Sequence, residues 1–551
     1  MGDGLRLDMN ALDYLILALY FITVLGIGFA ARRAIRTSVD FFLSGRSLPA
    51  WVTGLAFVSA NLGALEIIGM AANGAQYGAM TVHYYWIGAV PAMVFLGIVM
   101  MPFYYGSKVR SVPEYLRLRF NRPTHLLNAI SFAVAQVLIA GVNLYALALI
   151  MQALLGWPLW VAIVIGALIV LAYITIGGLS GAIYNEVLQF FVIIAGLVPI
   201  TVIGLVKVGG VNGLMDAVRD SKLGEAGLHA WQDTGSTDNP LGAHWLGIVF
   251  GLGFVLSFGY WTTNFAEVQR ALSARNMSAA RRTPIIGAYP KLLIPLVTVI
   301  PGLIALVTVK GLGAEEGDLV YNNAIPLLMR DLLPNGVLGI AVTGLVASFM
   351  AGMAANVSGF NTVFTYDIWQ AYFKRDRPDE YYVKVGRIAT VVAVVVGIGT
   401  AFIAAGFSNI MNYIQALFSV FNAPLFGTFI IGMFWRRMSP LAGFWSLLAG
   451  TVVAIGTYLL HLGHVVRFNS DLEESFWGAG LAFVTVAVVA AILTPLTRPK
   501  RNDELTGLVY GLSDATLKDD SLAGDAAWYR SPVLLGVIAV VLAALFYIPV
   551  F

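Results

Sequence analysis

The chain has 551 residues, of which 59% are hydrophobic and 11% are charged, with a mean hydropathy of +0.81 and a net charge of +3. This composition excludes a water-soluble globular protein and predicts an integral membrane protein, and the small net charge gives no reason to expect a nucleic-acid partner. The absence of cysteine excludes disulfide bonds and thiolate metal sites.

Apolar segments of about 20 residues, the length that crosses a bilayer, recur along the whole chain. They predict an all-α protein with about fourteen transmembrane helices, centred near residues 20, 62, 92, 138, 166, 195, 255, 298, 350, 395, 422, 450, 485 and 541. The first segment, in MGDGLRLDMNALDYLILALYF, lacks a cationic region and a small-residue cleavage site. We therefore expect it to be a retained helix rather than a signal peptide.

Arginine and lysine cluster in alternate connections, for example in residues 108–122, 270–282 and 374–387. With fourteen crossings these clusters all fall on one face, which the positive-inside rule identifies as cytoplasmic. Both termini then face the extracellular or periplasmic side, and the polar segment at about 500–530 is a cytoplasmic loop. The pattern predicts a multi-pass protein of the cell membrane.

A polar interruption, SANLGALEIIGMAANG, occupies residues 59–74 inside one predicted helix. Gly63 and Gly69 also fit close helix packing, but packing does not explain Asn61 or the mid-span carboxylate Glu66. Because a charged group at membrane depth usually faces a cavity or a partner, Glu66 is a candidate functional residue.

A second interruption lies in VLSFGYWTTNFAE, residues 255–267, where we expect the helix to break near Ser257 to Tyr260. Two interruptions at corresponding points of two halves are typical of inverted-repeat transporters, whose solute site lies at the membrane midplane. Irregular backbone is tolerated at that depth because it lines a cavity. The pattern therefore predicts a central cavity that binds a small-molecule solute.

Two more ionisable residues, Lys291 and Glu186, lie within predicted spans. Glu186 is close enough to the cytoplasmic end of its helix for its side chain to reach interfacial water, so a structural role stays open. An unpaired lysine and an unpaired carboxylate would each be costly in the membrane. We therefore hypothesise that Glu66 and Lys291 share one cavity and compensate each other's charge.

Six motifs occur in an order that resembles the solute:sodium symporter family, nearest to its sodium–glucose/galactose cotransporter branch. They are SANLGALEIIGMAANGAQYG, SVPEYLRLRF, GGLSGAIYNEVLQ, GYWTTNFAEVQRALSARN, AYPKLLIPLVTVIPG and FTYDIWQAY. The resemblance implies alternating access and a LeuT-like 5+5 inverted-repeat fold. Its parts would be a leading helix and linker (1–49), repeat 1 (50–207), an extracellular loop (208–242), repeat 2 (243–435) and trailing helices (436–551).

The resemblance also implies a solute site made of Asn61, Glu66, Tyr85, Ser257, Tyr260, Lys291 and Gln415. Tyr260, Lys291 and Gln415 match the family pattern, and Asn61 matches the asparagine that organises the first break. The other three depart from it, since the family has Gln, Glu and Asn in place of Glu66, Tyr85 and Ser257. These changes alter the donors and acceptors of the cavity. A sugar or sugar-like solute is expected, although galactose is in doubt and carboxylates, amino acids and nucleosides stay open.

The family's sodium site maps onto the carbonyl positions Ser59 and Leu62 and onto Ser348, Ala351, Gly352 and Glu186. Ala351 and Gly352 replace a pair of hydroxyl residues, although sodium binds through several hard oxygen ligands. Three alternatives stay open. Sodium binds through the remaining oxygens and water, protons drive transport through Glu66 or Glu186, or the protein is an uncoupled uniporter or a sensor.

Other functional classes have little support in the sequence. The six histidines are scattered, only His461 and His464 have helical metal-binding spacing, and no phosphate-binding loop is present. We therefore expect a protein that is not an enzyme and has no cofactor beyond a coupling ion, Na+ or H+. Its expected partners are the lipid bilayer and the solute, without a required protein partner.

Overall fold

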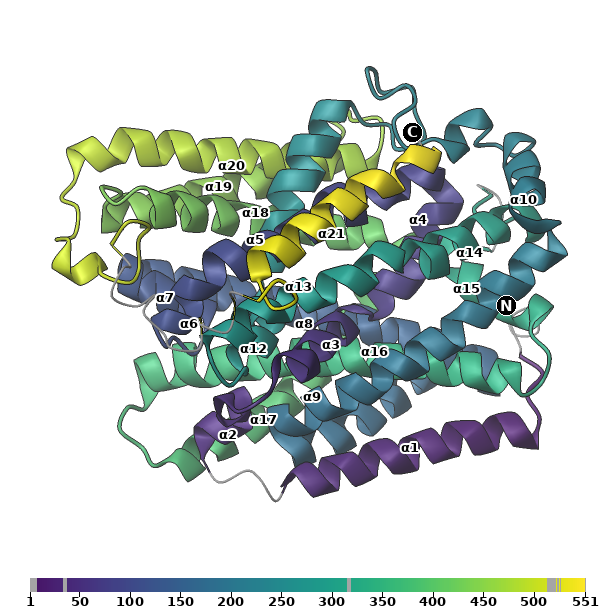
Figure 1. Cartoon of the computed structure of the whole chain (residues 1–551), viewed down its shortest axis with the longest axis horizontal. Helices are drawn as coiled ribbons and strands as arrows, with labels where there is room; N and C mark the ends of the chain where they lie inside the picture. The colour runs from purple at the N-terminus through teal and green to yellow at the C-terminus, as the bar shows by residue number, and fades with distance from the viewer. Residues whose placement is uncertain are drawn as a thin grey trace.

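The computed structural model describes residues 7–32, 37–314, 319–512, 522, 525 and 527–550, which are almost entirely helical (Figure 1). This described part holds no β-strand, only an isolated bridge between Leu48 and Ala274. Residues 513–521 of the predicted cytoplasmic loop lie outside it.

The α-helices are α1 (Ala11–Arg32), α2 (Ser38–Leu43), α3 (Ala50–Asn61), α4 (Met70–Tyr77), α5 (Val90–Phe95), α6 (Met101–Gly106), α7 (Val112–Arg119), α8 (Arg122–Leu155), α9 (Leu159–Lys207), α10 (Gly210–Arg219), α11 (Ser257–Thr263), α12 (Phe265–Leu272), α13 (Met277–Leu293), α14 (Pro295–Thr308), α15 (Ala324–Leu332), α16 (Val337–Val363), α17 (Asp379–Ala404), α18 (Ile410–Phe434), α19 (Pro440–Leu462), α20 (Asp471–Leu496) and α21 (Pro532–Phe546). Wider π-helical segments continue several of them, notably η2 (Leu65–Gly69), η7 (Gly247–Leu256) and η9 (Phe364–Phe373).

Eleven helices in the described residues are long and apolar enough to cross a membrane, or up to 13 if each of two bent pairs counts as one span. The apolar helix Leu159–Ala172 is shorter. Thirteen of the fourteen predicted centres fall within helices, and the fourteenth, residue 62, lies at the break between α3 and η2. The all-α membrane architecture is thus confirmed, while the number fourteen stays a prediction.

The helix α9 contains two of the predicted spans. Its 49 residues would extend about 73 Å at 1.5 Å per residue, more than twice the thickness of a bilayer core of about 30 Å. The start of α9 follows the end of α8, where the carbonyl of Ala153 accepts a hydrogen bond from the amide of Leu7. The end of α9 is bonded to the C-terminal end of α15, because Lys207 donates to the carbonyl of Asp331. The connection that follows α15 is bonded to Asp8, the neighbour of Leu7, through the side chain of Asn335, so both ends of α9 lie at one face. The chain therefore reverses direction within α9.

Both ends of the described chain lie on one face of the bundle (Figure 1). At the N-terminal end, Leu7 is bonded to the end of α8, as above. At the C-terminal end, the carbonyl of Val550 accepts a hydrogen bond from the amide of Ala230, in the connection between α10 and η7. Two chain ends on the same face agree with an even number of membrane crossings.

The first broken helix consists of Ala50–Asn61 and Leu65–Val82, which meet at an angle of 58°. Leu62 leaves the helical region with φ −74° and ψ 46°, and the freed amide of Ala64 donates to the side chain of Asn143 at 2.9 Å. A Cβ on Gly63 would lie 2.6 Å from Oδ1 of that asparagine, so only glycine allows the amide to approach the break. The first predicted interruption is confirmed.

The second broken helix consists of Gly247–Thr263 and Phe265–Leu272, at an angle of 49°. The break lies at Asn264, four residues beyond the predicted stretch Ser257 to Tyr260, and that detail of the prediction was wrong. Asn264 is extended, with ψ 110°, and its side chain accepts from the amide of Ala266 as an N-cap. Gly259 stays helical because it packs against α18, where a Cβ would lie 3.1 Å from the carbonyl oxygen of Asn422.

The short helix α7, from the motif SVPEYLRLRF, binds the C-terminal end of α18. Ser111 caps its N-terminus by accepting from the amide of Glu114. The buried guanidinium of Arg119 donates to the carbonyls of Gly432, Trp435 and Met438 at 2.7–3.1 Å. Burial lowers the pKa of Arg119 to about 10, so the side chain stays cationic at neutral pH and stabilises the negative end of the helix dipole.

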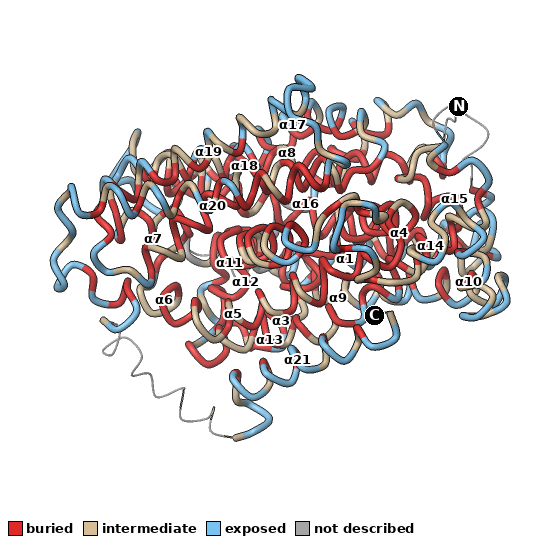
Figure 2. The backbone as a smooth tube through the Cα atoms, turned by 90° about the horizontal axis from the view of Figure 1, so that it is seen from above, coloured by how far each residue is buried: buried red, intermediate tan, exposed pale blue. Residues whose placement is uncertain are grey.

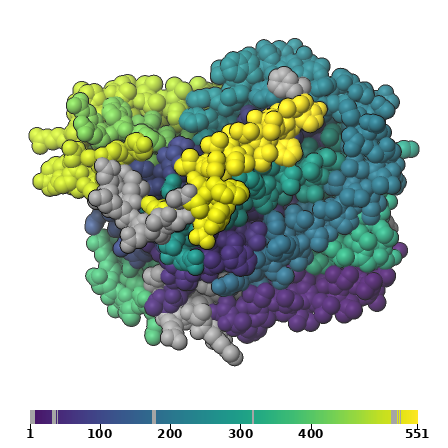
Figure 3. Space-filling model, viewed as in Figure 1, coloured from purple at the N-terminus to yellow at the C-terminus, as the bar shows by residue number. Residues whose placement is uncertain are grey.

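Buried residues concentrate in the centre of the bundle, around α3, α11, α12, α13 and α16 (Figure 2). The trailing helices are peripheral. α19 and α20 pack against each other and against α18, while α21 crosses the surface over α13 and α5 (Figure 3). Both broken helices belong to the central group, since α3 packs against α12, α13 and α16.

Candidate functional site

A cavity lies between the two broken helices. It is lined by Asn61, Leu65, Glu66, Met70, Tyr84, Tyr85, Ala89, Leu252, Leu256, Ser257, Tyr260, Trp261, Lys291, Met411, Gln415 and Phe418. All seven residues predicted from the resemblance to bind solute are in this set. The structure brings them together from the first broken helix and four helical segments that are distant from it in sequence, and their role in binding stays a prediction.

Glu66 and Lys291 form a buried ion pair in this cavity. Oε2 of Glu66 lies 2.8 Å from Nζ of Lys291, and the two side chains are 3% and 2% exposed. The ammonium also lies 5.1 Å from the centroid of the Trp261 ring and 5.5 Å from that of Tyr85, both in the range of cation–π attraction. The two residues therefore share one cavity and form an ion pair, as hypothesised, and their energetic compensation stays a prediction.

A chain of hydrogen bonds continues from Lys291 towards the second break. Lys291 donates to Oδ1 of Asn61, whose amide nitrogen donates to the hydroxyl of Tyr260 at 2.8 Å. The Tyr260 hydroxyl in turn donates to Oε1 of Glu267, also at 2.8 Å. The first break, the second break and α13 are thus joined by one polar network.

Glu267 was missed by the sequence analysis. It follows the second break by three residues and is 2% exposed, and its other oxygen, Oε2, has no hydrogen-bond partner among the described residues. Its carboxylate within an apolar stretch was the available signal. A break placed four residues too early left no reason to connect Glu267 with Tyr260.

The remaining predicted solute residues are held in place individually. The Tyr85 hydroxyl shares a hydrogen bond of 3.0 Å with Thr298, and the Ser257 hydroxyl donates to the carbonyl of Leu252 at 2.8 Å. The Gln415 amide nitrogen contacts the sulfur of Met411 at 3.3 Å. Oε1 of Gln415 and Oε1 of Glu66 are buried without a hydrogen-bond partner in the described structure, so two acceptors of the cavity are unsatisfied.

Aromatic side chains close the cavity towards the second break. The ring of Phe418 lies 4.7 Å from that of Tyr260, which meets Trp261 edge-on at 5.3 Å. The cavity has a volume of about 40 Å³, enough for about three water molecules. A larger solute therefore requires these walls to move apart.

Four of the positions mapped from the family's cation site, Ser59, Leu62, Ser348 and Gly352, meet at the first break. Ser348 on α16 donates to the carbonyl of Leu62, and the hydroxyl of Ser59 is buried without a partner in the described residues. The amide oxygen of Asn143 is next to Gly352, where a Cβ would lie only 2.5 Å from it. A side-chain oxygen thus fills the space that a hydroxyl residue at 352 would need. Ala351 is buried and offers no oxygen ligand from its side chain.

Glu186 is fully buried, so the expectation that its side chain could reach interfacial water was wrong. Both carboxylate oxygens accept hydrogen bonds from Arg270 on α12, one of them at 3.2 Å. Each side chain is fully buried, so the charges compensate each other. This pair ties α9 to the second broken helix, and its carboxylate has no free charge to offer a cation.

Comparison with known proteins agrees with this geometry. The profile of the sodium:solute symporter family matches residues 41–450. The sodium/glucose cotransporter of Vibrio parahaemolyticus is 28% identical over 81% of this chain and 85% of its own length. The sodium/glucose cotransporter 4 of Danio rerio is 30% identical over 88% of this chain and 79% of its own length.

A solved structure of a Na+-coupled sialic acid symporter, substrate-bound and outward-open, superposes with a TM-score of 0.74. It covers 90% of this chain and 100% of that chain at 20% identity, which shows a shared fold. The architecture is therefore the LeuT-like fold of sodium symporters. The relatives are cotransporters and not enzymes, and the matched profile spans most of the chain. The protein belongs to the sodium:solute symporter family.

Proposed function

We propose that the protein is a sodium-coupled symporter of a neutral polyhydroxylated solute, a sugar or sugar-like compound, which works by alternating access. The observation that carries the proposal is the polar cavity between two broken helices, where a compensated ion pair lies beside unsatisfied acceptors. The similarity to two sodium/glucose cotransporters supports the solute class.

The hydrogen-bonding inventory of the cavity favours a solute rich in donors. Glu66 and Gln415 each present a buried oxygen that lacks a donor among the described residues. A hydroxylated solute satisfies such acceptors, and a site built in this way rejects analogues that leave them unpaired. An anionic solute would bring its charge close to the carboxylate of Glu66. Tyr85, Tyr260 and Trp261 add aromatic faces and hydroxyls suited to a sugar ring.

Sodium binding is supported by four oxygens around the first break. They are the carbonyl of Leu62, the hydroxyls of Ser59 and Ser348, and the amide oxygen of Asn143, which retains a second lone pair beyond its bond to Ala64. Neutral hard oxygens suit a hard cation. We propose that Asn143 replaces the hydroxyl ligand that Gly352 lacks.

Proton coupling is the alternative that Glu66 supports. Its carboxylate lies in the solute cavity and pairs with Lys291, so a proton on Glu66 would leave the lysine charge uncompensated. This alternative predicts uptake that follows a pH gradient in the absence of sodium. The four neutral oxygens around Leu62 favour sodium instead.

We further propose that residues 50–207 and 243–435 are two inverted repeats. Each begins with a broken helix, bent by 58° and by 49°, and the two breaks share the hydrogen-bond chain through Asn61 and Tyr260. In the proposed orientation the termini face outward from the cell membrane, since the basic connections are on the opposite face.

Thermal stabilisation of the purified protein tests the solute class. Glucose, galactose, mannose and myo-inositol would be added separately, with and without sodium. A ligand at 100 times its dissociation constant stabilises the folded state by about 2.7 kcal/mol. We expect stabilisation that requires sodium and that Gln415→Leu removes.

The matched control is Gln189→Leu, which replaces a buried amide bonded to Tyr20 outside the cavity. This variant should keep the response to solute. A response that survives in Gln415→Leu, or no response to any solute of the panel, would contradict the proposal.

A further inference from the structure

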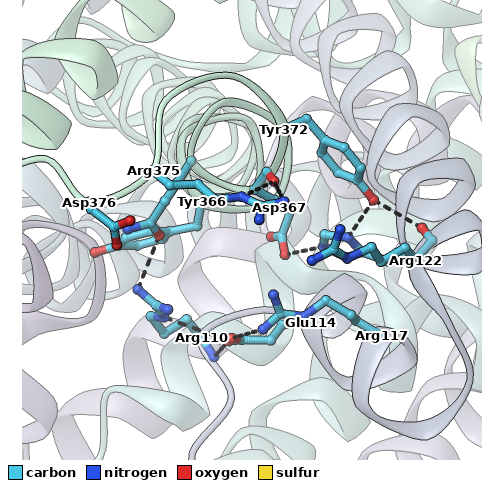
Figure 4. Close-up of a pocket in the computed structure, with 12 residues that line it drawn as sticks. Arg110, Glu114, Arg117, Arg122, Tyr366, Asp367, Tyr372, Arg375 and Asp376 are labelled. Atoms are coloured by element: carbon cyan, nitrogen blue, oxygen red, sulfur yellow. Dashed lines mark hydrogen bonds and ion pairs between the residues drawn. The ribbon is translucent and has the colours of Figure 1, made fainter.

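A second polar pocket opens on the face of the bundle opposite to the chain ends, where α7 ends and α8 begins. It has a volume of about 250 Å³ and lies between these two helices and η9, the segment that continues α16 (Figure 4). Four arginines line it: Arg110, Arg117, Arg122 and Arg375. None of the residues assigned to solute or sodium lines this pocket, so it has no part in the transport site.

One wall of the pocket is a fixed chain of hydrogen bonds. Oδ1 of Asp367 lies 2.8 Å from Nε2 of His125, whose Nδ1 lies 3.1 Å from the hydroxyl of Tyr372. That hydroxyl donates to the carbonyl of Arg122 at 3.0 Å. These contacts hold η9 against the start of α8, so this wall of the pocket is fixed by hydrogen bonds (Figure 4).

Two of the four guanidinium groups are already matched by a carboxylate. Glu114 lies 3.2 Å from Arg117 and 3.7 Å from Arg110, and it also accepts from the backbone amide of Arg110. Arg110 additionally stacks on the ring of Tyr366 at 4.5 Å. These contacts hold the side chains of Arg110 and Arg117 in place along the α7 side of the pocket.

The other two guanidinium groups have no such match. Asp376 also lines the pocket, but within the described residues neither it nor another carboxylate lies at ion-pair distance from Arg122 or Arg375. The guanidinium of Arg375 donates to the carbonyl of Ala371 in its own segment, which leaves further N–H groups for a ligand. Planar guanidinium groups are suited to paired hydrogen bonds with phosphate oxygens.

One acceptor in the pocket complements these donors. Oδ2 of Asp367 is buried, and it has no hydrogen-bond partner among the residues that the structure describes. An anion alone would be repelled by this oxygen, whereas a phosphate that carries a hydroxylated substituent can donate to it. The combination fits a phosphate ester with a free hydroxyl, as in a glycerol headgroup.

The surroundings indicate that such a group comes from a lipid. Phe373, which follows the lining residue Tyr372, is 65% exposed, and Leu118, which follows the lining residue Arg117, is 37% exposed, so large apolar side chains are exposed next to the pocket in sequence. Basic pockets between transmembrane helices at the cytoplasmic side bind anionic headgroups in general. The volume of about 250 Å³ is below the range of about 300–1,000 Å³ typical of drug-sized ligands, so the pocket suits a headgroup better than a whole organic ligand.

We propose that this pocket binds the phosphate of an anionic phospholipid, with Arg122 and Arg375 on the phosphate and Asp367 on a headgroup hydroxyl. The lipid would bridge α8 to η9 and hence to α16, which carries Ser348 of the proposed sodium site. Free phosphate shares the same chemistry and is distinguished by the experiment below.

The test uses the full-length protein in nanodiscs of phosphatidylcholine with a small fraction of phosphatidylglycerol. The protein is released from the nanodisc in the mass spectrometer, and native mass spectrometry counts the lipid molecules that stay bound to it. The unmodified protein should retain phosphatidylglycerol in preference to phosphatidylcholine. Arg122→Ala combined with Arg375→Ala should weaken this retention by about 25-fold, since each cationic side chain near an anionic surface contributes about fivefold. Arg122→Lys with Arg375→Lys keeps the charge but loses the paired hydrogen bonds, so it should retain more lipid than the double alanine variant and less than the unmodified protein.

The matched control is Arg437→Ala, an exposed arginine on the same face but outside the pocket. It should weaken lipid retention by no more than about fivefold, the contribution of a single cationic side chain near an anionic surface. Inorganic phosphate that competes with the lipid would support the site and identify phosphate as the recognised group. Phosphate binding without any preference for phosphatidylglycerol would overturn the lipid assignment. Equal lipid retention by the double alanine variant and by Arg437→Ala would overturn the site itself.

Discussion

Replacement of Lys291 by methionine removes one half of the ion pair that defines the central cavity. The side chains of Glu66 and Lys291 are 3% and 2% exposed and their charged atoms are 2.8 Å apart, so the carboxylate of the variant would be left buried without compensation. Removal of one partner of a buried pair costs about 3–5 kcal/mol of the free energy of unfolding. Replacement of both partners by apolar residues of similar volume is often neutral.

We therefore expect Lys291→Met to lose about 3–5 kcal/mol and the combination with Glu66→Leu to recover most of this loss. The assay is a denaturant titration of the four proteins in one detergent, analysed as a double-mutant cycle. Arg219→Met, which breaks an exposed pair with Glu225, serves as the control and should change stability little. Additive losses for the two single variants, within about 0.5 kcal/mol, would refute the reasoning, since they would show that the charges do not interact.

Tyr260→Phe removes the hydroxyl between the two breaks and leaves Glu267 without its donor, so uptake should fall with a loss of stability of about 1–3 kcal/mol; unchanged stability and uptake would contradict the network. Gly352→Ser should cost about 1–3 kcal/mol by overpacking, because its Cβ would lie 2.5 Å from Oδ1 of Asn143. Thermal unfolding should show partial recovery when Asn143→Ala is added, and a fully tolerated Gly352→Ser would show that no such crowding exists. Ser348→Ala should raise the sodium concentration for half-maximal uptake several-fold while solute specificity is retained, and an unchanged sodium dependence would remove Ser348 from the proposed site.

The central ion pair and the first break were predictable from sequence, because each depends on local signals. A carboxylate and a lysine in apolar segments need compensation, and Leu62 to Ala64 follows an asparagine and precedes Glu66. The structure confirms both the break and the pairing. The number of crossings was less accessible, because two predicted spans form the single element α9.

The position of the second break shows what sequence alone does not contain, and Glu267 was missed because its signal depends on that position. Gly259 weakens a helix in isolation, yet it stays helical because the backbone of Asn422 packs against it. The chain leaves the helix instead at Asn264, whose side chain replaces the lost backbone bond. Asn143 was missed for a similar reason, since it is on a regular helix and its importance depends on the distant Gly63 and Gly352.

Uptake into proteoliposomes tests the central claim most directly. A labelled solute that stabilises the protein would be supplied outside, under an inward sodium gradient with no pH gradient. The account predicts accumulation above the external concentration, which collapses when sodium is equal on both sides and is lost in Lys291→Met. Uptake that stops at equilibrium, or that follows an imposed pH gradient and ignores sodium, would contradict it.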